Sequence, residues 1–61
     1  GQLVVRDASA SWAKVFTLGG SLVAQGGVKS GEATFSLASL PVGVMVVKTS
    51  TGKAMKFVVR R

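Results

Sequence analysis

The sequence predicts a single all-β domain, an antiparallel sandwich of about six to seven strands. Glycine-containing turn signals recur about every eight to twelve residues, as is typical of sandwiches. No stretch shows the apolar period of a helix. The chain has 61 residues, so one small core is all that it can build. We therefore treat residues 1–61 as one domain of marginal stability.

The longest β-branched stretch predicts the central strand. Residues 42–47 are apolar at every position except Gly43, so we expect both faces of this strand to be buried. Pro41 has no N–H to donate and belongs at the strand entrance, while Gly43 indicates a bend. Before this junction, residues 32–37 alternate between polar and apolar side chains, which predicts a strand with Ala33, Phe35 and Leu37 facing the core.

The remaining strands are bounded by turn signals. Gly19 and Gly20 lie between two β-prone runs and predict a hairpin with a tight two-residue loop, which pairs Phe16 with Val23. Residues 3–5 predict a first or edge strand. Gly52 is the expected left-handed residue of a turn before the last strand. In that strand Met55, Phe57 and Val59 share one face, opposite Lys56, Val58 and Arg60.

Composition excludes several functions. The chain has no Cys and no His, which excludes disulfides and the usual zinc sites. Its two acids are far apart in sequence, and its hydroxyl residues have no base beside them, so we expect no catalysis and no cofactor. No apolar run approaches the roughly 18 residues that cross a bilayer, so we expect no membrane insertion.

The charge is strongly positive, with a formal net charge of +6, which attracts anionic partners. We interpret the scattered lysines as solubilising groups that also discourage edge pairing. Phe16, Phe35 and Phe57 lie in strands that point them toward the core, and Trp12 is interpreted as a lid on that core. Stacking platforms among the lysines are then missing, so no nucleic-acid partner is expected.

Three stretches in a fixed order resemble one known family. Residues 15–23 (VFTLGGSLV), 37–48 (LASLPVGVMVVK) and 56–60 (KFVVR) are similar to the hairpin, the strand entrance and the ending of the type A C-terminal sorting domain of the type IX secretion system. The family usually has Asp, Arg and Tyr where this chain has Thr17, Ser21 and Met45.

The resemblance implies an immunoglobulin-like β-sandwich that acts as an address on exported cargo in the Bacteroidetes. A cargo domain would precede it in a larger protein. The implied partners are the type IX translocon with its shuttle proteins and the sortase that removes the domain. The implied location is the periplasm in transit and then the cell surface or the medium.

The same resemblance assigns residues to roles. Gly19 and Gly20 form the hairpin turn, and Leu40, Pro41 and Gly43 form the loop into the central strand. The implied recognition element is the last strand together with the end of the central one: Lys48, Lys56, Phe57, Val58, Val59, Arg60 and Arg61. An equally weighted alternative is that the apolar residues of the last strand only close the sandwich.

A different class of function stays open. The domain could be a structural spacer of a secreted protein, or a self-association module. A sandwich this short is expected to leave one sheet edge unpaired, which permits a homodimer through that edge.

Overall fold

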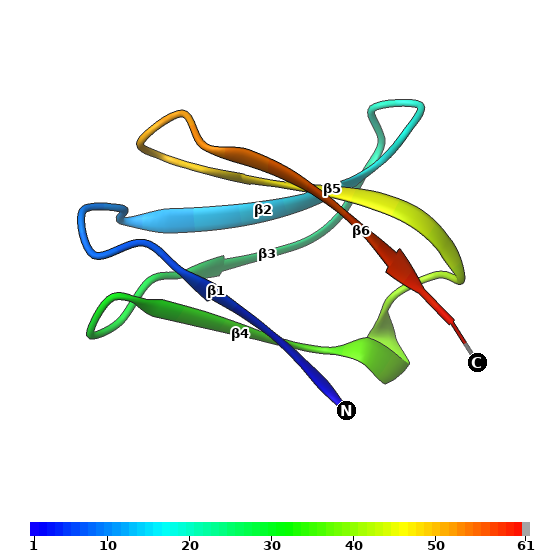
Figure 1. The fold of residues 1–61 in the computed structure, drawn as a ribbon, viewed down its shortest axis with the longest axis horizontal. Coiled ribbons are helices and arrows are strands. Elements are labelled where there is room, and N and C mark those ends of the chain that lie inside the picture. Colours follow the sequence, from blue (N-terminus) through cyan, green and yellow to red (C-terminus); the bar gives the residue numbers. More distant parts are fainter. Residues whose placement is uncertain (61) are drawn as a thin grey trace.

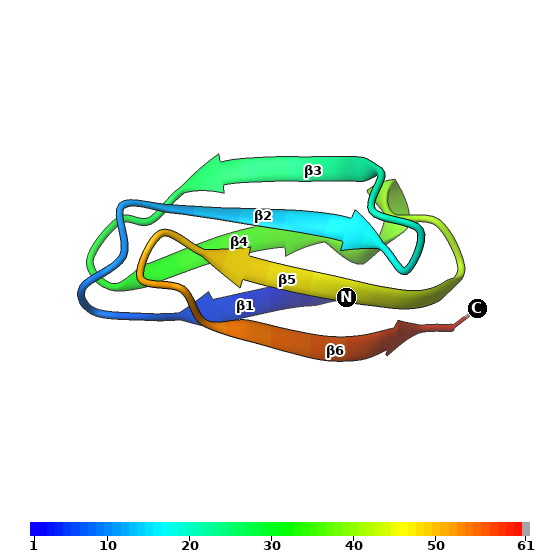
Figure 2. The same ribbon diagram turned by 90° about the horizontal axis from the view of Figure 1, so that it is seen from above.

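The computed structural model describes residues 1–60 and confirms the all-β fold. Its strands and its one short 3-10 helix are β1 (Gln2–Arg6), β2 (Trp12–Thr17), β3 (Leu22–Gly27), β4 (Glu32–Ser36), η1 (Leu37–Ser39), β5 (Gly43–Thr49) and β6 (Ala54–Val59). They form a two-stranded sheet, β1–β4, and a four-stranded sheet in the order β3–β2–β5–β6. All pairings are antiparallel. The smaller sheet lies beneath the larger one (Figures 1 and 2).

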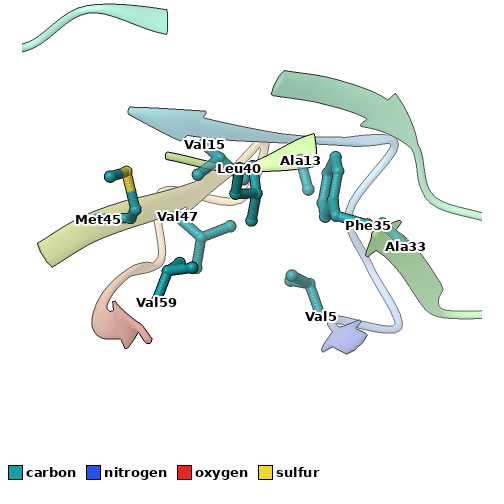
Figure 3. Close-up of a cluster of buried hydrophobic side chains, with 9 residues drawn as sticks. All are labelled: Val5, Ala13, Val15, Ala33, Phe35, Leu40, Met45, Val47 and Val59. Carbon is teal, nitrogen blue, oxygen red and sulfur yellow. The ribbon is translucent and has the colours of Figure 1, made fainter. Parts of the chain in front are cut away.

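The core lies between the two sheets, where side chains from both meet (Figure 3). Alternate residues of each strand point into this space, as the pleat requires. Leu40 comes from the loop before β5 and is only 1% exposed. The buried apolar side chains are Val5, Ala13, Val15, Ala33, Phe35, Leu40, Met45, Val47 and Val59. Leu37, in η1, packs against this cluster from its edge.

The predicted central strand is β5, which has β2 and β6 as neighbours. Its two-sided burial was predicted wrongly. Met45 and Val47 are buried, but Val44 on the opposite face is exposed, and Val42 precedes the strand and is also exposed. The two-stranded sheet covers only one face of the four-stranded sheet, so the apolar residues on the other face meet solvent.

The β2–β3 hairpin has a longer loop than its two glycines suggested. The N–H of Thr17 donates to the carbonyl of Ser21 over 2.9 Å, and the N–H of Gly20 donates to the carbonyl of Thr17 over 3.0 Å. Gly20 has φ +93°. This is a three-residue loop that ends in a left-handed glycine. The predicted pairing of Phe16 with Val23 is therefore wrong, because Phe16 lies opposite Leu22 and the register shifts between Val15 and Phe16.

Candidate recognition surface

The last strand is an edge strand of the larger sheet. β6 contains four of the predicted recognition residues, Lys56, Phe57, Val58 and Val59. Within the described chain its only hydrogen-bonded neighbour is β5. Arg60 follows the strand and is exposed, and Arg61 lies outside the described residues. The other edge of the sheet is β3.

The turn before β6 fixes which of its backbone groups face outward. The N–H of Thr49 donates to the carbonyl of Lys53, and the N–H of Gly52 donates to the carbonyl of Thr49, both over 3.0 Å. Gly52 has φ +92°, which confirms the predicted left-handed turn residue. Hydrogen-bonded pairs alternate with non-bonded pairs along an antiparallel ladder. Counted from Thr49 and Lys53, the backbone N–H and C=O of Lys56 and Val58 point away from β5, toward the open edge.

The inner face of β6 closes the core only along part of its length. Val59 is 2% exposed and opposes Gly43. Phe57 is half-buried and packs against the core cluster, while Met55 remains 46% exposed although its partner Val47 is buried. In Figure 2 β6 lies at the outer side of the layered strands. The burial of the inward-facing side chains thus decreases along β6 from Val59 to Met55.

Three lysines gather on the outer face of the larger sheet. Lys14 of β2 lies directly opposite Lys48 of β5. Lys48 pairs in turn with Ala54, two residues before Lys56 on the same face of β6. We call Lys14, Lys48 and Lys56 the lysine band. Spacing along the sequence does not bring these three lysines together, since cross-strand register cannot be derived from it.

Two aromatic rings lie beneath this band. The Nζ of Lys14 is 4.6 Å from the ring centroid of Trp12, and the Nζ of Lys48 is 5.5 Å from that of Phe16. Both distances are in the range of cation–π contacts. Trp12 is therefore not a core lid, and Phe16 does not point into the core. Ala13 and Val15 occupy the inward positions of β2 instead.

The two aromatics predicted to face the core in other strands do so. Phe35 is buried, and Phe57 packs against the buried cluster. Exposed aliphatic side chains complete the outer face beside the lysine band. Val44 of β5 pairs with Val58 of β6, and both are exposed. The outer face thus mixes cations with apolar groups.

Neither acid of the protein neutralises the lysine band. The Nε of Arg6 donates to the Oε2 of Glu32 over 2.8 Å, which forms an ion pair in the two-stranded sheet. Asp7 follows β1 and is 6% exposed; its Oδ2 accepts hydrogen bonds from the hydroxyls of Thr49 (2.9 Å) and Thr51. The sequence contains no other acidic residue. Within residues 1–60, no acidic side chain therefore compensates the positive charge of the outer face.

The contacts of Asp7 tie loops together at one end of the sandwich. Its Oδ1 accepts the N–H of Ser9, and its own N–H donates to the carbonyl of Gly31 over 2.9 Å. The hydrogen bond from Thr51 lowers the pKa of Asp7 below its usual 3.8, helped by Thr49, Ser9 and the charge of Lys53 and opposed by burial. No local sequence pattern predicts this cluster, because Asp7 and Gly31 are distant in sequence from each other and from Thr49 and Thr51.

The residues predicted to shape the turns lie at strand ends. Gly20 takes the left-handed position of the β2–β3 loop, whereas Gly19 lies in that loop without a positive φ. Gly43 has φ +131° at the start of β5. Leu40 fills the core and Pro41 is exposed beside it. The implied loop residues thus support the entry into β5.

Residues 1–60 contain no group of three or more His, Cys, Asp or Glu side chains that could hold a metal ion, and no pocket. None of the helical structure in this range is long or apolar enough to span a membrane.

Comparison with protein-family models, with curated protein sequences and with solved structures returned no match to this chain.

Proposed function

We propose that the chain is a C-terminal secretion signal that directs cargo through the type IX translocon and presents it to the sortase for removal and surface attachment. The observation that carries this proposal is the position of β6. The strand that contains the implied recognition residues is an edge strand with unpaired backbone groups at Lys56 and Val58 among the described residues. Such an edge can be read by a partner through hydrogen bonds and side-chain contacts together.

The three stretches that resemble the family all contribute strands to one sheet. Residues 15–23 form the turn end of the β2–β3 hairpin, residues 37–48 contain η1 and most of β5, and residues 56–60 cover the end of β6. These four strands are neighbours in the order β3–β2–β5–β6. Elements that are separate in the sequence therefore contribute to one contiguous surface, as a recognition domain requires.

The other proposed partners come from the resemblance to the sorting-domain family. A cargo domain would precede residue 1, and translocon or shuttle proteins would contact the β6 edge. The path would run through the periplasm to the cell surface or the medium. The domain itself would have no enzymatic role, since the activity would belong to the cargo.

Export of a fusion protein tests this function. Residues 1–61 are joined to the C-terminus of an inert periplasmic reporter in a bacterium with a working type IX system and in a translocon-deficient strain. We expect reporter on the surface or in the medium of the competent strain only. A reporter that folds but stays in the periplasm of both strains contradicts the sorting function.

Exposed residues of β6 locate the signal without disturbing the core. Lys56→Glu and Val58→Asp change side chains that face solvent, so both variants are expected to fold and to lose export. Lys29→Glu, an exposed lysine in the β3–β4 loop, is the matched control and is expected to be exported. Equal translocon-dependent export of all three variants would show that Lys56 and Val58 are not part of the signal, whereas retention of the unmodified fusion in the periplasm would favour the alternative of a structural spacer or self-association module.

A further inference from the structure

We propose that the β6 edge binds an extended polypeptide segment as a fifth strand, and that this segment carries acidic side chains on its outer face and apolar side chains on its inner face. This inference rests on the proposed function, because it takes β6 as the recognised element. It adds the chemistry of the segment that β6 binds.

The backbone of β6 supplies the attachment. The N–H and C=O groups of Lys56 and Val58 point to the open side of the sheet, and no strand of the described chain occupies that side. A strand placed there continues the antiparallel sheet by hydrogen bonds that carry no sequence information. Side chains must then determine which segment binds.

The outer face selects for negative charge. Side chains of an added strand would lie beside those of Lys56 and Val58, at the cross-strand spacing of about 4.5–5.5 Å. Lys56 belongs to the lysine band, Arg60 follows β6 as a further exposed cation, and both acids of the protein are engaged elsewhere. Acidic residues are the complement that this face lacks.

The inner face selects for apolar side chains. Met55 points to the core side of the sheet and is nevertheless 46% exposed, and Phe57 next to it on the same face is half-buried. Apolar residues of an added strand would cover these two side chains and extend the core beyond β6. A segment in which acidic and apolar residues alternate satisfies both faces.

A second copy of the chain fits this edge less well. Its own β6 would bring another Lys56 and Arg60 to a face that is already positive, and like charges across strands are destabilising. The β3 edge is also a poorer site, because β3 has no charged residue and ends in Gly26 and Gly27, which have no side chains to pack.

A peptide-binding assay with the 61-residue protein tests the inference. The probe is a fluorescein-labelled peptide of about ten residues in which glutamate and valine alternate, followed by anisotropy at low salt. Three control peptides have the same length: glutamine alternating with valine, lysine alternating with valine, and a block of glutamates followed by a block of valines. We expect the alternating acidic peptide to bind at least about tenfold more tightly than each control.

Two substitutions examine charge and backbone separately. Lys56→Glu is expected to weaken binding about tenfold by placing like charge opposite the peptide. Val58→Pro removes an N–H that β5 does not use, a change that edge strands tolerate. It is expected to weaken binding about fivefold or more, because the added strand loses this donor. Val58→Thr keeps the donor and the β-branched shape, and is expected to bind normally.

Amide hydrogen exchange of the unmodified protein gives a readout that needs no variant. Peptide binding is expected to protect the amides of Lys56 and Val58, whose N–H groups face the open edge, while those of β3 stay unchanged. Equal binding of the alternating and block acidic peptides, or no protection at Lys56 and Val58, would overturn strand addition.

A labelled single-stranded oligothymidine of similar length serves as the competing ligand class. If it binds more tightly than the acidic peptide, and Val58→Pro binds it as well as the unmodified protein does, the lysine band recognises phosphate and the inference is wrong. The assay is independent of export. Export without peptide binding contradicts this inference alone, whereas peptide binding without export contradicts the sorting function alone.

Discussion

Lys14 and Lys48 lie directly opposite each other on neighbouring strands, and no acid lies on their face of the sheet. Like charges in this position destabilise a sheet. Each ammonium is instead placed over an aromatic ring, Trp12 for Lys14 and Phe16 for Lys48. The face therefore contains a like-charge pair in which each ammonium is placed over an aromatic ring and not beside a carboxylate.

The repulsion can be measured by a double-mutant cycle with Lys14→Gln, Lys48→Gln and the double variant. We expect a coupling free energy of about 0.2–1 kcal/mol that opposes folding at low salt. The cycle cancels the loss of each cation–π contact, because that loss occurs both in the corresponding single variant and in the double variant. Urea denaturation supplies the free energies of unfolding.

Salt provides the internal check on this cycle. The coupling is expected to approach zero near 1 M NaCl, where the screening length is about 3 Å. A coupling that favours folding, or one that is unchanged by salt, would show that the two ammonium groups do not interact as like charges.

Asp7 gives the domain an acid-sensitive contact. Its hydrogen bonds lower its pKa in the folded state below the value of 3.8 that holds without them. The ionised carboxylate therefore contributes stability that is fully present above about pH 4, and that is lost as the pH falls through the lowered pKa. We expect the free energy of unfolding to decrease over this acidic range.

The variant Asp7→Asn distinguishes the contribution of Asp7 to the acid dependence from that of Glu32, the other side-chain carboxylate. The variant is expected to be less stable than the unmodified protein at pH 7 and to lose less stability on acidification, as measured by thermal unfolding across the pH range. Glu32→Gln, which removes an exposed ion pair with Arg6, is the control and is expected to leave most of the acid dependence in place. An acid limb that is identical in Asp7→Asn would contradict the assignment.

The parts of the fold that were predicted correctly depend on local patterns. The alternation before η1 placed Ala33 and Phe35 inward, and Gly52 marked a turn whose φ requires glycine. Both features are determined by residues adjacent in sequence. The faces of β6 were likewise predicted from alternation, which put Lys56 and Val58 opposite Phe57 and Val59.

The parts that were missed depend on which strands are neighbours. An apolar stretch such as residues 42–47 does not reveal that a sandwich of four strands over two leaves its outer face bare, so Val44 was wrongly expected to be buried. The β2–β3 loop was predicted one residue too short. The wider turn is accompanied by a hydrogen bond from the N–H of Ser21 to the Thr17 hydroxyl over 3.2 Å, a contact that the two glycines do not indicate. The lysine band follows from the pairing of β2 with β5, a long-range register that composition cannot reveal.

Leu40 is expected to be the most sensitive position of the loop before β5. Leu40→Ala removes a side chain that is 1% exposed between the two sheets, and such truncations cost about 2–5 kcal/mol. A domain of this size has a total stability of about the same magnitude. We therefore expect Leu40→Ala to be largely unfolded already at the start of a urea titration. Pro41→Ala, at the exposed neighbouring position, is expected to lower the free energy of unfolding by about 1 kcal/mol or less. Equal losses for the two variants would contradict the packing role of Leu40.

Gly43 tests the same junction through its backbone. Its φ of +131° is a conformation that other residues rarely adopt, while a Cβ added there would meet no atom within 4 Å. The cost of Gly43→Ala is therefore conformational, and is expected to be about 1–2 kcal/mol. Gly19→Ala is the matched control, because Gly19 has no positive φ and its added Cβ would meet only the Thr17 Oγ1 at 3.8 Å. We expect this control to be neutral or slightly stabilising in urea denaturation. If Gly43→Ala is as stable as Gly19→Ala, then β5 can begin without the left-handed residue, and the Pro41–Gly43 junction does not determine the entry into the strand.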